Sequence, residues 1–87
     1  MNLTVFQIEY ILKREDYCLI TVKYVSGKKE FNITNESKLN DIPLTPYLDM
    51  PRKVDENGNL MLDYYILKTK SIVDADKFKI GQIVQLS

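Results

Sequence analysis

The chain has 87 residues, of which 45% are hydrophobic and 28% are charged, so we expect one globular domain over residues 1–87 and no long disordered segment. Its 12 basic and 12 acidic residues give a net charge of +0, which argues against a general binder of duplex nucleic acid and against an acidic mimic of nucleic acid. Histidine is absent and cysteine occurs once, which excludes the commonest general base, the commonest metal ligand and an internal disulfide.

The amino-terminal segment alternates between apolar and polar side chains. Phe6 and Ile8 fall on one side of an extended chain and Gln7 and Glu9 on the other, which is the period-two pattern of a strand. After the polar stretch KRED, residues 17–25 are rich in β-branched and aromatic side chains and predict a second strand.

A two-residue loop at Ser26 and Gly27 would turn the second strand back into a third. In that register Lys23 faces Glu30 and Val22 faces Phe31. Such cross-strand pairs contribute roughly 0.2–1 kcal/mol each. The sequence therefore predicts a meander of three strands over the first third of the chain.

The middle of the chain carries helix-capping residues and then prolines. Thr34 and Asn35 allow one short helix over residues 35–42. Three prolines then disfavour both a central strand and a helix interior, so we expect a stiff loop that carries Leu44, Tyr47, Leu48 and Met50.

The stretch VDENGNL, from Val54 to Leu60, resembles the start of a calcium loop but fails its spacing. Counted from Asp55, glycine is fourth instead of sixth, and the twelfth residue is Ile66 instead of glutamate. Asn-Gly between apolar runs predicts a hairpin.

Two registers compete for this hairpin. A two-residue loop places Val54 opposite Met61 and lets Arg52 face Asp63, whereas a bulged loop places Val54 opposite Leu60. The bulged register gathers one apolar face, and we favour it because burying that face outweighs an exposed ion pair worth roughly 0–1 kcal/mol. The residues of that face are Val54, Leu60, Leu62, Tyr64 and Ile66.

The last strand is predicted from Phe78, Ile80, Val84 and Leu86, which share one parity, with a bend at Gly81. A small sheet of this kind hides its edges by closing on itself. We therefore predict an all-β or β-rich α+β fold: a small closed or partly closed barrel with five to six strands and at most one short helix. The short helix favours an OB-like arrangement and the proline loop an SH3-like one, and both stay open.

The sequence offers no catalytic site. Cys18 shares the parity of Ile20 and Val22, which predicts a core residue and not a nucleophile. The three glycines are far apart, so no phosphate-binding loop is present. We expect no enzyme activity, no metal and no cofactor.

Tyrosine is frequent, with six residues, and exposed tyrosine is typical of protein interfaces. Tyr64 and Tyr65 are adjacent and point to opposite faces of a strand, and the favoured register leaves Tyr65 exposed. The candidate partner-binding residues are Tyr47, Leu48, Met50, Tyr65, Lys68 and Lys70.

These features predict a small non-catalytic interaction module, a protein-binding accessory or regulatory protein. The alternative is a single-stranded nucleic-acid-binding protein of OB type, in which tyrosines and lysines would converge on one face. A homodimer is compatible with the sequence.

The first ten residues do not resemble a secretion signal, and no apolar run reaches the roughly 20 residues of a membrane span, so we expect a cytoplasmic protein with no membrane partner. The Asn- and Lys-rich composition suits an AT-rich bacterium, phage or mobile element.

Overall fold

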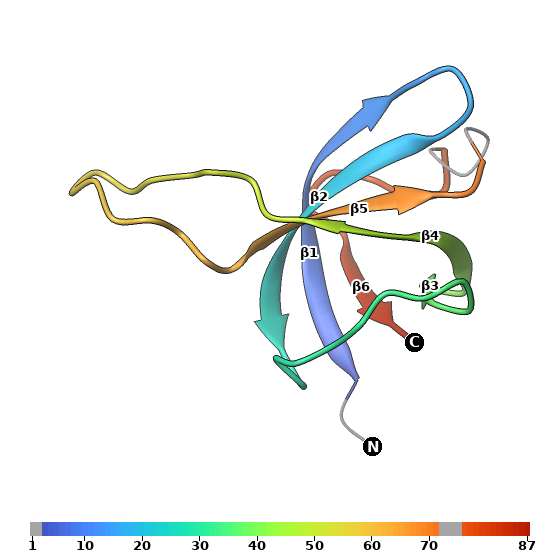
Figure 1. The fold of residues 1–87 in the computed structure, drawn as a ribbon, viewed down its shortest axis with the longest axis horizontal. Helices are drawn as coiled ribbons and strands as arrows, with labels where there is room; N and C mark the ends of the chain where they lie inside the picture. The colour runs from blue at the N-terminus through green and yellow to red at the C-terminus, as the bar shows by residue number, and fades with distance from the viewer. Residues whose placement is uncertain (1–2, 72–75) are drawn as a thin grey trace.

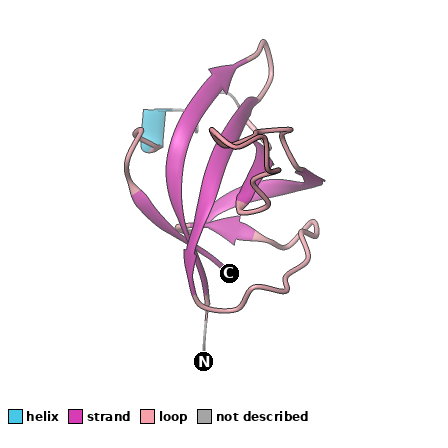
Figure 2. Cartoon of the chain, turned by 90° about the vertical axis from the view of Figure 1, so that its left-hand side faces the viewer, coloured by secondary structure: helices cyan, strands magenta, loops and turns pink. Residues whose placement is uncertain are grey.

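The computed structural model describes residues 3–71 and 76–87. Six antiparallel strands form a closed barrel in the order β1-β2-β5-β4-β3-β6 (Figure 1), which confirms the prediction of a small β-barrel. The strands are β1 (Thr4–Lys13), β2 (Cys18–Ser26), β3 (Lys38–Leu39), β4 (Ile42–Asp49), β5 (Tyr64–Thr69) and β6 (Ile83–Leu86). Figure 2 shows a barrel of strands and loops with a short helical turn at its edge, and within the described residues this turn includes Asp76 and Lys77.

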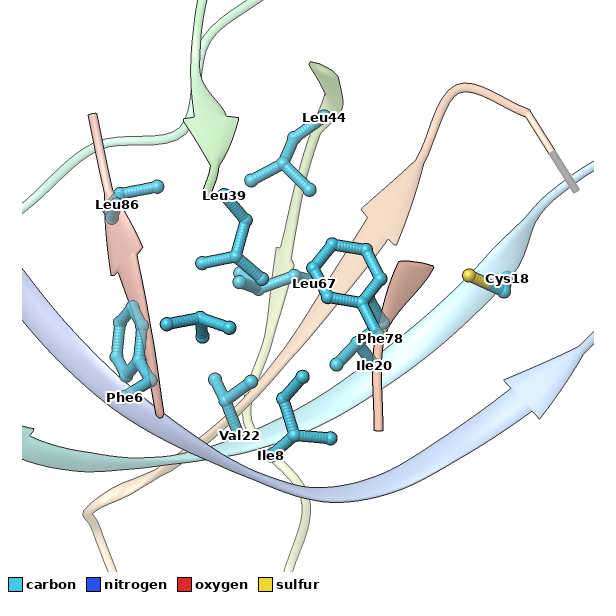
Figure 3. Close-up of a cluster of buried hydrophobic side chains, with 11 residues drawn as sticks. Phe6, Ile8, Cys18, Ile20, Val22, Leu39, Leu44, Leu67, Phe78 and Leu86 are labelled. Atoms are coloured by element: carbon cyan, nitrogen blue, oxygen red, sulfur yellow. The ribbon is translucent and has the colours of Figure 1, made fainter. Parts of the chain in front are cut away.

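The first two strands form as the alternation predicts. Phe6 and Ile8 from β1 and Ile20 and Val22 from β2 point into the barrel and are buried (Figure 3). The register between β1 and β2 shifts at Glu9, a bulge that increases twist and lets a long strand curve around the core. The other edge of β1 pairs with β6 from Thr4 to Gln7, and this second pairing closes the ring.

The core fills the barrel from every strand. Leu67 from β5, Val84 from β6 and Phe78 from the preceding turn are all buried, as are Leu39 and Leu44. Cys18 is fully buried with its Sγ 3.3 Å from the Thr69 hydroxyl, so the prediction of a core residue is confirmed. Ile80, predicted to share the inward parity of Phe78, is exposed because the turn at Gly81 breaks the alternation.

The predicted hairpin at Ser26 and Gly27 is wrong. The strands beside β2 are β1 and β5, with Val22 opposite Tyr65, whereas residues 27–36 form a connector that leads to β3 without pairing to β2. Pairs worth under about 1 kcal/mol each, such as the one expected between Lys23 and Glu30, do not outweigh a register that places the apolar side of β5 against the core.

The predicted short helix over residues 35–42 is also wrong. Asn40 and Asp41 have φ values of 49° and 66°, so they form a tight two-residue turn between β3 and β4. Side chains of Asn and Asp tolerate this left-handed conformation better than most. The turn replaces the helix that favoured an OB-like arrangement.

Two prolines lie inside β4, where we predicted a loop. Pro43 pairs with Lys38 of β3, and Pro46 lies where the β4–β5 register is irregular. Between the pair Leu44–Thr69 and the pair Leu48–Leu67, β4 advances by four positions and β5 by two. A proline is tolerated at such a bulge because the ladder needs no N–H there.

Candidate functional site

The most prominent feature outside the barrel is a hairpin between β4 and β5, residues 50–63, which we call the arm (Figure 1). Val54 lies opposite Leu60, which confirms the bulged register. The N–H of Asp55 donates to the carbonyl of Asn59 (2.9 Å), and the N–H of Met61 donates to the carbonyl of Lys53 (2.8 Å). These two bonds hold the legs of the arm together.

The tip of the arm is a turn built on Asp55. One carboxylate oxygen accepts the N–H groups of Asn57 and Asn59, each at 2.9 Å, and the Asp55 carbonyl accepts the N–H of Gly58 at 3.0 Å. Gly58 has a φ of +82°, as the turn requires. The alternating acids and amides therefore serve the backbone, and the described residues contain no cluster of three or more potential metal ligands.

The apolar side chains of the arm are exposed, contrary to the prediction that they are buried. Val54, Leu60 and Leu62 have exposed fractions of 63%, 56% and 59%, and Met50 at the base is exposed too. Of the predicted apolar face, only Tyr64 is buried and Ile66 is half-buried. The reason is that the β4–β5 pairing ends at Asp49 and Ile66, so the arm runs past the barrel wall.

The base of the arm is fixed to the barrel. The carbonyl of Asp63 accepts the N–H of Tyr24 at 2.8 Å, and the Asp63 carboxylate lies 3.3 Å from the Lys29 ammonium. The ammonium of Lys53 lies 4.5 Å from the centre of the Tyr64 ring. The arm therefore has an anchored base and a tip that projects into solvent.

A surface groove of about 460 Å³ lies beside this base. Leu48 and Tyr65 line it from the barrel, and the connector contributes Lys28, Lys29, Glu30, Phe31 and Asn32. The Tyr65 ring is half-buried, not exposed as predicted, and lies 5.8 Å from the Phe6 ring and 5.0 Å from the Phe31 ring between centroids. Edge-to-face contacts at these distances are favourable.

Two other candidate residues, Tyr47 and Lys68, lie together away from the groove. The Lys68 ammonium is 4.2 Å from the centre of the Tyr17 ring and 6.0 Å from that of Tyr47, a cation–π arrangement. Lys70 lies apart from both and donates from its ammonium to the carbonyl of Asn35 at 2.9 Å.

The structure thus divides the six candidates among several places. Leu48 and Tyr65 share the groove, Met50 lies at the base of the arm, Tyr47 and Lys68 share a ring contact, and Lys70 contacts the connector. Sequence reasoning missed the exposure of Val54, Leu60 and Leu62. The apolar pattern and register of the hairpin were readable, but how far it extends beyond β4 and β5 was not.

Comparison of the chain with models of known protein families, with curated proteins and with solved structures finds no match. Within residues 3–71 and 76–87, no helix has the length and apolar character needed to cross a membrane. A small barrel serves many functions, so the chemistry of the arm and the groove, and not the fold, bears on function.

Proposed function

We propose that the protein is a non-catalytic interaction module that binds a protein partner through the arm and the groove at its base. The observation that supports this is the exposure of Val54, Leu60 and Leu62 on a projecting hairpin. Burial of apolar surface gains about 25 cal/mol per Å². The barrel does not bury these side chains, so this free energy is gained only when a partner covers them. Clustered exposed apolar side chains are typical of recognition surfaces.

The geometry reduces the entropy cost of binding. The base of the arm is held by Asp63, and the tip by the Asp55 turn, so little of the backbone must be ordered when a partner arrives. The groove adds Leu48 and Tyr65, with polar residues of the connector beside them. An apolar centre with a polar rim is the usual composition of a protein interface.

The first leg of the arm is suited to side-chain burial more than to strand addition. Pro51 has no N–H, and the N–H of Met50 already donates to the Asp49 carboxylate at 2.8 Å. A strand edge with few available donors is a poor template for a partner strand. We therefore expect the arm to insert its apolar side chains into a hollow of the partner.

The positions of the lysines favour a protein over single-stranded nucleic acid. Lys53 and Lys23 lie over the Tyr64 ring, and Lys68 lies over the Tyr17 ring. A base needs an uncovered ring face on which to stack. These rings are therefore poorly placed as a stacking platform.

The test compares the wild-type protein with a Leu60→Asp variant in quantitative capture from a lysate of the source organism. We expect a specific partner to be lost from Leu60→Asp and kept by the control Val25→Asp, because Val25 is an exposed apolar residue on β2 outside the arm. Capture of the same proteins by both variants would contradict the proposal. Tyr65→Ala is a poor test, since it also removes a ring packed on Phe6.

A second measurement addresses the nucleic-acid alternative. Binding of a labelled single-stranded oligonucleotide is measured at low and high salt. Micromolar or tighter binding that weakens steeply with salt would overturn the proposal in favour of that alternative.

A further inference from the structure

The barrel carries a second exposed apolar surface on the side away from the arm. In the closed order of strands, the β4–β5 junction that bears the arm lies opposite the β6–β1 junction. At the latter, Tyr10, Ile80 and Ile83 have exposed fractions of 54%, 66% and 52%. We call these three residues the outer patch.

Backbone hydrogen bonds fix the outer patch beside β1. The N–H of Ile8 donates to the carbonyl of Gln82 at 2.9 Å, and the N–H of Gly81 donates to the carbonyl of Ile8 at 2.6 Å. Gln7 and Ile83 face each other across the two strands. Ile80 and Ile83 are therefore presented next to the strand that carries Tyr10.

The charges at the tip of the arm and around the outer patch are of opposite sign. The tip carries the exposed acids Asp55 and Glu56, while the exposed basic residues Arg52 and Lys53 lie nearer the base. Three exposed lysines flank the outer patch: Lys13, Lys77 and Lys79. Two acids, Glu9 and Asp76, lie in the same region, and the Asp76 carboxylate is 3.5 Å from the Lys13 ammonium. The arm combines apolar side chains with an acidic tip, and the outer patch combines apolar side chains with a basic border.

We propose that the arm of one copy docks on the outer patch of a second copy. This inference rests on the arm being a recognition surface, as proposed above, and it names the partner. Val54 and Leu60 would cover Ile80 and Ile83, while the acids of the tip approach the lysines. A chain cannot make this contact with itself, because β4 and β5, which bear its own arm, lie across the closed barrel from β6 and β1.

The contact is heterologous, because it joins two different surfaces. Each new pair leaves one arm and one outer patch unoccupied, so assembly continues beyond a dimer unless a ring closes. A net charge of +0 offers no overall repulsion against such assembly.

The association is expected to be weak and sensitive to salt. One hairpin arm supplies fewer residues than the roughly 20–30 per side of a standard stable interface. The ionic part is screened over about 8 Å at physiological ionic strength. The average mass in solution should therefore rise with protein concentration and fall when salt is added.

Sedimentation velocity over a concentration series tests the proposal with two disabled variants and a control. Leu60→Asp disables the arm, Ile83→Asp disables the outer patch, and Val25→Asp changes an exposed apolar residue outside both. We expect wild type and Val25→Asp to associate and each disabled variant to remain monomeric. A mixture of the two disabled variants should form a one-to-one dimer and nothing larger, since one intact arm and one intact patch remain.

A charge exchange tests the orientation. Glu56→Lys should weaken association severalfold, and adding Lys79→Glu to the same chain should restore part of it. No recovery in the double variant would contradict the docked orientation.

Several outcomes would overturn the inference. Wild type that stays monomeric at every concentration would do so, and so would a mixture of disabled variants that fails to pair. If wild type is monomeric and Leu60→Asp still loses a partner in lysate capture, this inference fails while the proposed function stands. If Leu60→Asp changes neither measurement, both fail.

Discussion

Gly27 shows how one residue determines the path of the connector. Its φ is +88°, and a Cβ added there would lie 1.8 Å from the backbone carbonyl oxygen of Leu3. Gly81 has the same φ of +88°, but a Cβ added there meets nothing within 4 Å. The two positions separate the cost of backbone conformation from the cost of a steric clash.

We predict that Gly81→Ala lowers the free energy of unfolding by about 1 kcal/mol, the cost of placing an alanine at positive φ. Gly27→Ala should cost roughly 1–3 kcal/mol more, because the backbone at Leu3 must move. Urea unfolding of both variants measures the difference. Equal losses would mean that the connector is not pressed against the start of β1.

At the residue scale the sequence predicted the alternation but not always which side is inward. Tyr64 and Tyr65 do point to opposite faces, yet Tyr65 is the one that packs, half-buried, against the core, because it lies opposite Val22. Tyr64 is buried beneath Lys23 and Lys53 instead. The pairing of Tyr65 with Val22 joins β2 to a strand far along the chain. The assignment of Cys18 to the core needed only the local pattern of β2, and it was correct.

At the element scale, the turn between β3 and β4 is suboptimal at one of its two residues. Asn40 and Asp41 both have positive φ, and glycine is preferred at the second such position. The side-chain oxygen of Asn40 accepts the N–H of Gln85 at 2.8 Å and so ties the turn to β6. Asp41 takes part in no such tie that the described residues show.

We predict that Asp41→Gly raises the free energy of unfolding by up to about 1 kcal/mol, because it relieves a left-handed aspartate. Asn40→Gly should instead lower it by about 0.5–1.5 kcal/mol, because the hydrogen bond to Gln85 is lost. Thermal and urea unfolding measure both. A stabilising Asn40→Gly would show that the bond to β6 contributes nothing.

Secondary-structure elements were predictable where the local sequence pattern determines them. They were not predictable where strands far apart in the sequence compete for the same pairing edge. The arm has the predicted register because Asn-Gly and its flanking residues set it. The hairpin after β2 failed because β5 occupies that edge, and sequence reasoning compared only neighbouring segments. The helix failed because Asn40 and Asp41, inside the predicted helix, form a tight left-handed turn, while the cap candidate Thr34 accepts the N–H of Glu36 with its hydroxyl in a local turn.

For the whole molecule, the barrel and the arm should be separable. The buried core draws on every strand and on Phe78 but on no residue of the arm. Asp63, which bonds to Tyr24 and Lys29, marks the point where the arm joins the barrel.

We predict that replacing residues 51–61 with a short Gly-Ser linker leaves a folded barrel whose midpoint of thermal unfolding changes by only a few degrees, because no core side chain is removed. Self-association should be lost at the same time. Circular dichroism and sedimentation velocity measure the two effects. Unfolding of the shortened chain would assign the arm a structural role.

The fold class could be predicted from alternation and size, whereas the candidate site could not. The alternation along a strand shows which side chains are apolar. It does not show which of these side chains remain exposed once the strands close into a barrel. Val54 in the arm and Ile80 before β6 look like interior residues in the sequence, and both are exposed. Their exposure became visible only once the strand order was known.

The pairing of Thr4 with Leu86 has a consequence for synthesis of the protein. During synthesis β1 is made first and β6 is the last strand of the barrel to be made, so one edge of β1 stays unpaired until residues 83–86 have emerged from the ribosome. Contacts between residues so far apart in sequence slow folding. Chains that stall before Ile83 therefore cannot close the barrel, and we expect their exposed β1 edges to pair with one another. The synthesis of β6 is thus the step after which folding can prevail over aggregation.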